Sequence, residues 1–202
     1  MARFSFYDLE VVSEAPLTKT EHGLLPTGEG WFVLNARDAE WRVWPGRGRW
    51  PRLEGAQATF PQLGLGLTVL EPGEPLAMYH WEHDQEDFLV LHGEALAIVE
   101  GQERLLRTWD LLHCPAGTKH TIIGAGDAAS VIFAVGARER TMQRIADGRL
   151  TATVDWGAYP VDGVAVRYGA GVTEETSDKS TANATFPERV STRYRDGWLP
   201  GS

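Results

Sequence analysis

The sequence has very little cysteine and a deficit of basic residues. Cys114 is its only cysteine, so no disulfide can form within the chain, which is typical of a reducing compartment. The chain has 19 lysine and arginine residues against 28 aspartate and glutamate residues, a formal net charge of −9. This surplus of negative charge opposes contact with the phosphate backbone that dominates affinity for nucleic acids. We therefore expect no disulfide scaffold and no nucleic-acid partner.

The chain also lacks a long hydrophobic segment and a targeting signal. No apolar run approaches the roughly 20 residues that a membrane-spanning helix needs. Residues 1–17 contain no basic stretch followed by a continuous apolar stretch, as a secretory signal would. We predict a cytoplasmic protein with no membrane partner.

What is present is globular composition, with 43% hydrophobic and 23% charged residues in a chain of 202. This length suits a single domain with one hydrophobic core. Within one domain over residues 1–202 we predict an N-terminal arm at 1–58, a barrel core at 59–137 and a C-terminal extension at 138–202.

The central region reads as short strands separated by turn residues. Residues 63–70 alternate apolar and small or polar side chains with a period of two, which indicates a half-buried strand. Further strands are predicted within 77–83, 87–93, 94–101, 103–109, 111–115, 120–124 and 130–136. Closely spaced strands with glycine and proline at the corners predict an all-β sandwich or barrel.

The flanks follow less regular patterns. We expect one or two strands in the N-terminal arm, a helical turn within 138–148 and a short helix from Pro160 to Gly169. Residues 173–185 are polar, and we expect them to be mobile.

The chemically informative stretch is residues 72–93. Alternate side chains of a strand share a face, so Met78, His80 and Glu82 point the same way, and His80 and Glu82 can converge on one ion. After a turn near residues 84–85, the next strand brings Glu86 beside them, with Phe88 and Val90 continuing on the same face.

A second stretch supplies one more candidate ligand. Pro115 and Gly117 predict a tight turn that delivers His120 at the start of a strand that also carries Ile122. Imidazole and carboxylate donors suit iron, manganese, nickel, cobalt or zinc, and two carboxylates neutralise a divalent charge. The sequence therefore predicts one divalent metal bound by His80, Glu82, Glu86 and His120.

At these residues the chain resembles the cupin superfamily. The first cupin motif has a glycine, a His-x-His pair, a glutamate and a further glycine, here at Gly73, His80, Glu82, Glu86 and Gly93. The second has Pro-x-Gly and then a histidine, here at Pro115, Gly117 and His120. The resemblance covers about residues 73–124, and it implies a double-stranded β-helix (a jelly-roll barrel) with a metal at its mouth.

The chain departs from the cupin pattern at four places. One extra residue separates Gly73 from His80, and Glu82 replaces the second histidine, so the ligand set becomes two histidines and two glutamates. Trp109 stands where a glycine usually opens the second motif, and Gly124 where an asparagine often closes it. The alternative to a metal site is a polar pocket without metal, as in cupins that have lost their metal.

A separate motif lies in the N-terminal arm. Residues 41–52 contain four arginines interspersed with three tryptophans, and this segment could bind an anion. The interpretation that we prefer is structural: the tryptophans pack on the barrel and the arginines stay solvated.

Two functions remain open at this point. The resemblance implies either a metal-dependent enzyme acting on a small organic molecule, dioxygenase-like or isomerase-like, or a non-catalytic binding module. In an isomerase-like reaction Glu82 would act as the base. The pocket would have an apolar lining of Met78, Phe88, Val90 and Ile122, which indicates a partly hydrophobic ligand and favours the dioxygenase-like reaction slightly. We also expect a homodimer that covers exposed sheet edges.

Overall fold

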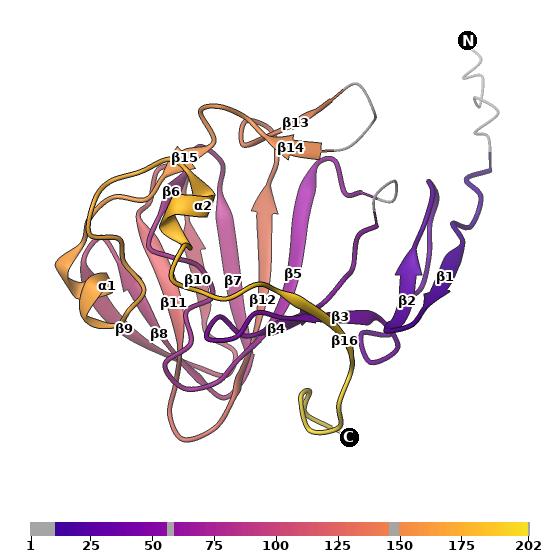
Figure 1. Ribbon diagram of the computed structural model, residues 1–202, viewed down its shortest axis with the longest axis horizontal. Helices are drawn as coiled ribbons and strands as arrows, with labels where there is room; N and C mark the ends of the chain where they lie inside the picture. Colours follow the sequence, from indigo (N-terminus) through magenta and orange to yellow (C-terminus); the bar gives the residue numbers. More distant parts are fainter. Residues whose placement is uncertain (1–10, 56–58, 146–149, 202) are drawn as a thin grey trace, which may run out of the picture.

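The computed structural model describes residues 11–55, 59–145 and 150–201, whose regular elements are β-strands apart from two short helices (Figure 1). The N-terminal strands are β1 (Leu17–Thr20), β2 (Gly23–Pro26), β3 (Glu40–Val43) and β4 (Arg49–Pro51). The central strands are β5 (Leu63–Leu70), β6 (Trp81–Glu82), β7 (Glu86–His92), β8 (Glu94–Val99), β9 (Gln102–Arg107), β10 (Leu111–Cys114), β11 (His120–Ala125) and β12 (Ser130–Ala137). The C-terminal elements are β13 (Met142–Arg144), β14 (Leu150–Ala152), β15 (Gly157–Ala158), α1 (Gly163–Arg167), α2 (Lys179–Ala182) and β16 (Val190–Arg193).

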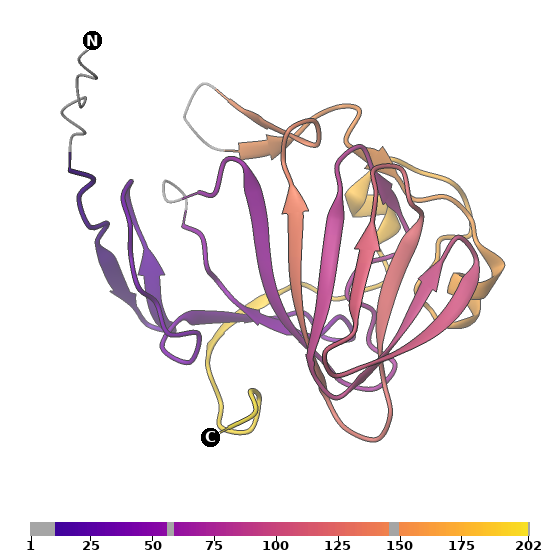
Figure 2. The ribbon, with the colours of Figure 1, turned by 180° about the vertical axis from the view of Figure 1, so that it is seen from behind.

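Two antiparallel sheets enclose the core. The larger has seven strands in the order β10-β7-β12-β5-β4-β3-β16, and the smaller has three in the order β11-β8-β9. Figure 1 and Figure 2 show the smaller sheet next to β10 and β7, at the end of the larger sheet that lies away from β3 and β16. The architecture is a double-stranded β-helix, as predicted.

The predicted alternation of inward and outward side chains is confirmed on β7. The inward side chains of β7, Phe88 and Val90, are 3% and 1% exposed, and they pack with Ile122 of β11 and Ile132 of β12. The predicted strand over 77–83 is much shorter, because only Trp81 and Glu82 pair with β15. Its preceding residues run beside β11 through isolated bridges instead.

The N-terminal arm is more structured than predicted. Its described part contains four strands instead of one or two, and residues 1–10 and 56–58 of the predicted arm lie outside the described residues. β3 pairs with β4 on one side and with β16 on the other, so the two chain ends complete the larger sheet together. Trp41 of β3 is fully buried, with Tyr194 and Trp198 of the C-terminal segment packed against it at ring-centroid distances of 5.6 and 5.1 Å.

The expectation that the arginines of residues 41–52 stay solvated is wrong for Arg47. Its side chain is buried, because the residue is only 5% exposed, and its guanidinium donates to the backbone oxygens of Pro75 and Leu76 and to the side chain of Asn183. Arg47 therefore joins the arm, the barrel and the C-terminal extension.

The C-terminal extension differs from the prediction in two places. Residues 142–144 form strand β13 instead of a helical turn, and residues 146–149 of that predicted turn lie outside the described residues. The polar segment 173–185 contains α2, which begins after the cap Asp178 and buries Ala182 against the molecule. The helix predicted from Pro160 is present as α1, with Asp162 as its cap.

Both unusual residues of the second motif have a structural setting. Position 124 requires glycine because the backbone of Glu71 lies close to it: a Cβ atom at residue 124 would be 2.2 Å from the backbone oxygen of Glu71. Trp109, at the usual glycine position, has a φ of 77°, in the left-handed region that favours glycine, and its side chain is 72% exposed.

Replacing Trp109 with glycine should therefore stabilise the protein. We expect the free energy of unfolding to rise by about 0.5–1 kcal/mol, the relief of left-handed strain less the entropy cost of an added glycine. Urea denaturation measures this change. Trp109→Ala keeps the strained backbone and should change stability by less than about 0.5 kcal/mol. A glycine variant no more stable than the alanine variant would contradict the interpretation.

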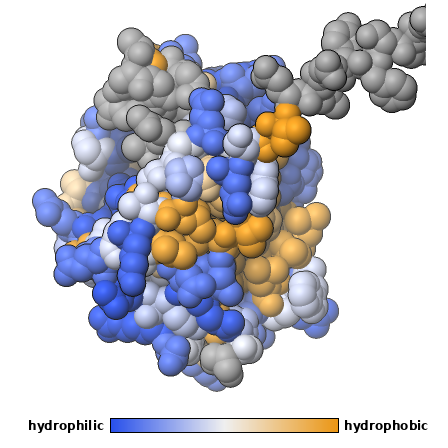
Figure 3. Space-filling model, turned by 90° about the vertical axis from the view of Figure 1, so that its right-hand side faces the viewer, coloured by the Kyte–Doolittle hydropathy of each residue, from blue (hydrophilic) through white to orange (hydrophobic). Residues whose placement is uncertain are grey.

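Hydrophobic side chains also gather on the face that carries β1, β2 and β5 (Figure 3). Large apolar patches on a protein surface commonly mark interaction sites. The homodimer expected from the sequence stays a prediction.

No helix among the described residues is long and apolar enough to cross a bilayer.

Candidate metal centre

Two histidines face one another where the segment before β6 meets the start of β11. The backbones of His80 and His120 form an isolated antiparallel bridge, and their rings lie 4.9 Å apart between centroids. The Nδ1 atom of His80 donates to the backbone oxygen of Met78 at 2.8 Å, and that of His120 to the backbone oxygen of Thr118 at 3.0 Å. A carbonyl oxygen only accepts, so both Nδ1 atoms carry the proton and both Nε2 atoms keep a lone pair when the rings are neutral.

The Glu86 carboxylate completes a three-residue cluster. Its Oε2 atom lies 3.3 Å from Nε2 of His120 and 3.4 Å from Nε2 of His80. The ligand atoms of all three residues lie within 4.8 Å of one another. Glu86 is placed there by β7, which pairs with β10 so that Glu86 faces Cys114.

The donor atoms fit a shared metal ion. Glu86 Oε2 and His120 Nε2 are buried and find no partner with hydrogen-bond geometry among the described residues, although they lie 3.3 Å apart. Two donor atoms on one metal, each about 2.1 Å from it, are separated by roughly 3.0–3.4 Å. Anchoring of the other ring nitrogen to a carbonyl is also the usual arrangement of a metal-binding histidine.

The electrostatics of the cluster favour a positive charge. Burial alone would lower the pKa of His120, but the Cys114 thiol and the Glu86 carboxylate outweigh it and raise that pKa to about 10. Burial would likewise raise the pKa of Glu86, and the two histidines hold it well below its usual range. A charge of +1 or more is therefore favoured beside Glu86, whether it is carried by a proton or by a cation.

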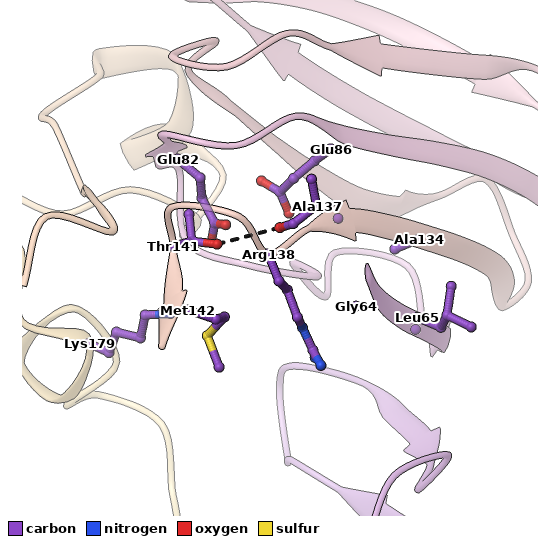
Figure 4. A pocket seen from close by; sticks show the side chains of 12 residues that line it. Gly64, Leu65, Glu82, Glu86, Ala134, Ala137, Arg138, Thr141, Met142 and Lys179 are labelled. Carbon is purple, nitrogen blue, oxygen red and sulfur yellow. Dashed lines mark hydrogen bonds between the residues drawn. The ribbon is translucent and has the colours of Figure 1, made fainter. Parts of the chain in front are cut away.

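Glu82 lies next to the cluster but outside it. Its Oε1 atom is 3.8 Å from Nε2 of His80, and burial together with the neighbouring Glu86 raises its pKa. The structure thus brings together three of the four predicted ligands and places Glu82 beside them. Figure 4 shows the carboxylates of Glu82 and Glu86 at one end of a pocket.

This pocket, which we call the metal pocket, has a volume of about 240 Å³. Gly64, Gly66 and Gly136 leave room along the inner faces of β5 and β12, while Arg138 and Lys179 supply positive charge. Arg138 is paired with Glu54 at 2.7 Å, whereas Lys179 lies 4.1 Å from the ring centroid of Trp156.

The Asp84 carboxylate holds one wall of the metal pocket in place through three hydrogen bonds. Asp84, which the sequence places in a turn, accepts hydrogen bonds from the backbone nitrogens of Arg140 and Thr141 and from the Thr141 hydroxyl, each at 2.8 Å. Burial would raise the pKa of Asp84, but these bonds outweigh it and lower that pKa below its ordinary value. These bonds hold the loop between β12 and β13 against the turn between β6 and β7, which carries Asp84.

The four predicted apolar pocket residues lie behind the cluster and do not line this pocket. Phe88, Val90 and Ile122 belong to the main hydrophobic core, and the Phe88 ring is 5.2 Å from the ring of His120. Met78 packs with Trp156 and Tyr159, and its backbone oxygen orients His80. Their role as a ligand-contacting lining stays a prediction.

Sequence reasoning missed the contribution of the C-terminal extension. Trp156 and Tyr159 stack near His80, with ring centroids 6.3 and 5.9 Å away, and α2 brings Lys179 to the pocket. The only signal in the sequence was a cluster of aromatic residues at 156–159 with no hydrophobic period to place it.

The cupin-domain family model matches residues 66–136, the segment from β5 to β12 that carries all the cluster residues. Residues 66–136 are therefore a cupin domain. No curated protein matches the chain significantly.

Solved structures that are similar to part of this chain include several bacterial proteins. A sugar phosphate isomerase from Silicibacter pomeroyi is 24% identical, with a TM-score of 0.41, over 60% of this chain and 85% of that one. A predicted oxalate decarboxylase from Thermotoga maritima is 19% identical, with a TM-score of 0.46, over 52% of this chain and 98% of that one. A protein from Acidithiobacillus ferrooxidans is 26% identical, with a TM-score of 0.38, over 39% of this chain and only 52% of its own length.

Proposed function

We propose that the protein is a metal-dependent cupin enzyme that acts on a small organic molecule in the metal pocket. The observation that carries the proposal is the pair of buried donor atoms, Glu86 Oε2 and His120 Nε2, that point to a common centre without a hydrogen-bond partner among the described residues. His80, Glu86 and His120 would hold the ion, and Glu82 would be the fourth ligand or the base. The ion would be iron, manganese, zinc or nickel.

The arrangement suits chemistry at one end of the metal pocket. A divalent ion supplies Lewis acidity or dioxygen activation when bound. His80, His120 and Glu86 would hold the ion with the two-histidine, one-carboxylate donor set that non-haem iron oxygenases use, which would leave positions for a ligand. Glu82, beside this set and at the pocket wall, lies where it can accept a proton from a bound molecule.

The first test is elemental analysis of protein purified without a nickel column or chelator, beside the Glu82→Gln variant. We expect close to one equivalent of a divalent metal in the native protein. Retention of that metal in the variant would assign Glu82 as the base, and its loss would assign Glu82 as a ligand. Oxygen uptake that depends on iron would then favour the dioxygenase-like reaction over the isomerase-like one.

A native protein that stays free of metal, even after each of the four ions is added back, would overturn the proposal. The remaining function would then be the metal-free binding module that the sequence left open.

A further inference from the structure

A second cavity adjoins the metal pocket along the inner face of β5. It has a volume of about 310 Å³, and its wall shares Leu65 and Gly66 with the metal pocket. Its other lining residues come mainly from the arm and the C-terminal segment: Trp44, Arg47, Trp50, Pro51, Thr68, Leu76 and Arg189. The two cavities thus lie side by side on one strand, with glycine at their common wall.

The far wall of this second cavity is built by long-range pairing. β16 pairs with β3 so that Val190 faces Val43, which sets Arg189 beside the turn between β3 and β4. The indole nitrogen of Trp44 donates to the backbone oxygen of Pro187 at 2.7 Å. The guanidinium carbons of Arg189 and Arg47 then lie 4.3 and 4.6 Å from the centroid of the Trp44 ring.

This wall carries positive charge that no neighbouring carboxylate neutralises. Among the ion pairs of residues 11–55, 59–145 and 150–201, none involves Arg42, Arg47 or Arg189. The buried Arg47 is hydrogen-bonded only to neutral oxygens. Glu188 lines the neighbouring groove with Arg42 and Arg189 but is in ion-pair contact with neither. In a protein of net charge −9 this wall is a local concentration of positive charge.

We propose that the ligand of the metal pocket extends past Gly66 into the second cavity, where Arg189 binds an anionic group at its far end. This inference rests on the proposed function and names its substrate class. The ligand is an elongated organic acid or phosphate ester, with one end at the metal, an apolar middle against Trp44 and Trp50, and an anion at the other end. Arginine suits this role because its planar guanidinium donates two parallel hydrogen bonds to a carboxylate or phosphate.

The test uses protein loaded with Co²⁺ and two matched series of linear probes. The dicarboxylates malonate, glutarate, pimelate and azelate are compared with monocarboxylates of equal length, from propionate to nonanoate. The visible spectrum of Co²⁺ reports binding at the metal end. Beyond a minimum length we expect each dicarboxylate to bind about tenfold more tightly than its monocarboxylate, as a charge-assisted hydrogen bond provides.

Arg189→Gln should reduce this preference to less than about twofold. Arg167→Gln is the matched control, because Arg167 lies on α1 and pairs with Glu103 at the surface, and it should keep the full preference. Gly66→Val should weaken the long probes more strongly than the short ones, because Gly66 lies on the wall that the two cavities share and a Cβ there meets only the Ala134 side chain, at 3.6 Å. Equal binding of the two series at every length, or a preference that survives in Arg189→Gln, would overturn the inference.

Failure of the proposed function would give a different result. If Co²⁺ does not bind, the anion end is tested alone, by tryptophan fluorescence with nonanoate against its uncharged amide, nonanamide. A preference that depends on Arg189 would still support an anion site in the second cavity. No preference would overturn it independently of the metal.

Discussion

Replacing His120 with alanine is expected to remove the metal from the protein while leaving the fold intact. The change deletes one of three donors that converge within 4.8 Å of one another. Loss of a residue that only orients a ligand already weakens metal binding about 10–100-fold, so loss of the ligand itself should exceed 100-fold. Plasma mass spectrometry of the gel-filtered protein should find about one equivalent in the native chain and background in the variant.

The matched control is His113→Ala. His113 lies on β10, pairs with Asp87 at 2.6 Å, and has a side chain that is 53% exposed and points away from the cluster. This variant should retain its metal, and both variants should keep the native far-ultraviolet circular dichroism. Full metal occupancy in His120→Ala, or equal loss in both variants, would contradict the assignment of the site.

The second large effect is expected at Trp41, and it concerns stability. Trp41→Ala should lower the free energy of unfolding by about 3–5 kcal/mol, because it removes a fully buried indole and leaves a cavity. That indole packs against Val69 and Val131 of the barrel and against the aromatic rings of Tyr194 and Trp198. Urea denaturation followed by circular dichroism measures the loss.

Trp31→Ala serves as the comparison for Trp41→Ala. Trp31 is also in the N-terminal arm, but it is 52% exposed, so its removal should cost much less than the removal of Trp41. A loss at Trp41 below about 1 kcal/mol would mean that the arm and the C-terminal segment contribute little to the core.

The strands of the barrel and the turns between them were predictable because their signal is local. In β7 buried and less buried side chains alternate, and burial of one face fixes the register. The same periodicity placed His80 and Glu82 on one face, and turn residues placed His120 at the start of β11. By contrast β6, with two paired residues, is too short for periodicity to define its ends.

The walls around the metal cluster were not predictable in this way. Lys179, Arg138 and Tyr159 reach the region of the site from segments whose local patterns are weak. Their positions depend on pairings such as β15 with β6 and on the hydrogen bonds of Asp84 to the loop after β12. Such contacts join residues far apart in the chain, and no local period encodes their register.

The sequence alone determined the all-β class, the central strands and the residues that carry the cupin motifs, because alternation and turn chemistry act over a few neighbouring residues. The tertiary structure decided that Glu86, His80 and His120 form the tight cluster while Glu82 stands beside it. It also decided that Arg47 is buried and that Arg189 lies beside Trp44, because β3 and β16 come from opposite ends of the chain. Pairing at that separation is selected by burial of the whole core, which only the folded molecule defines.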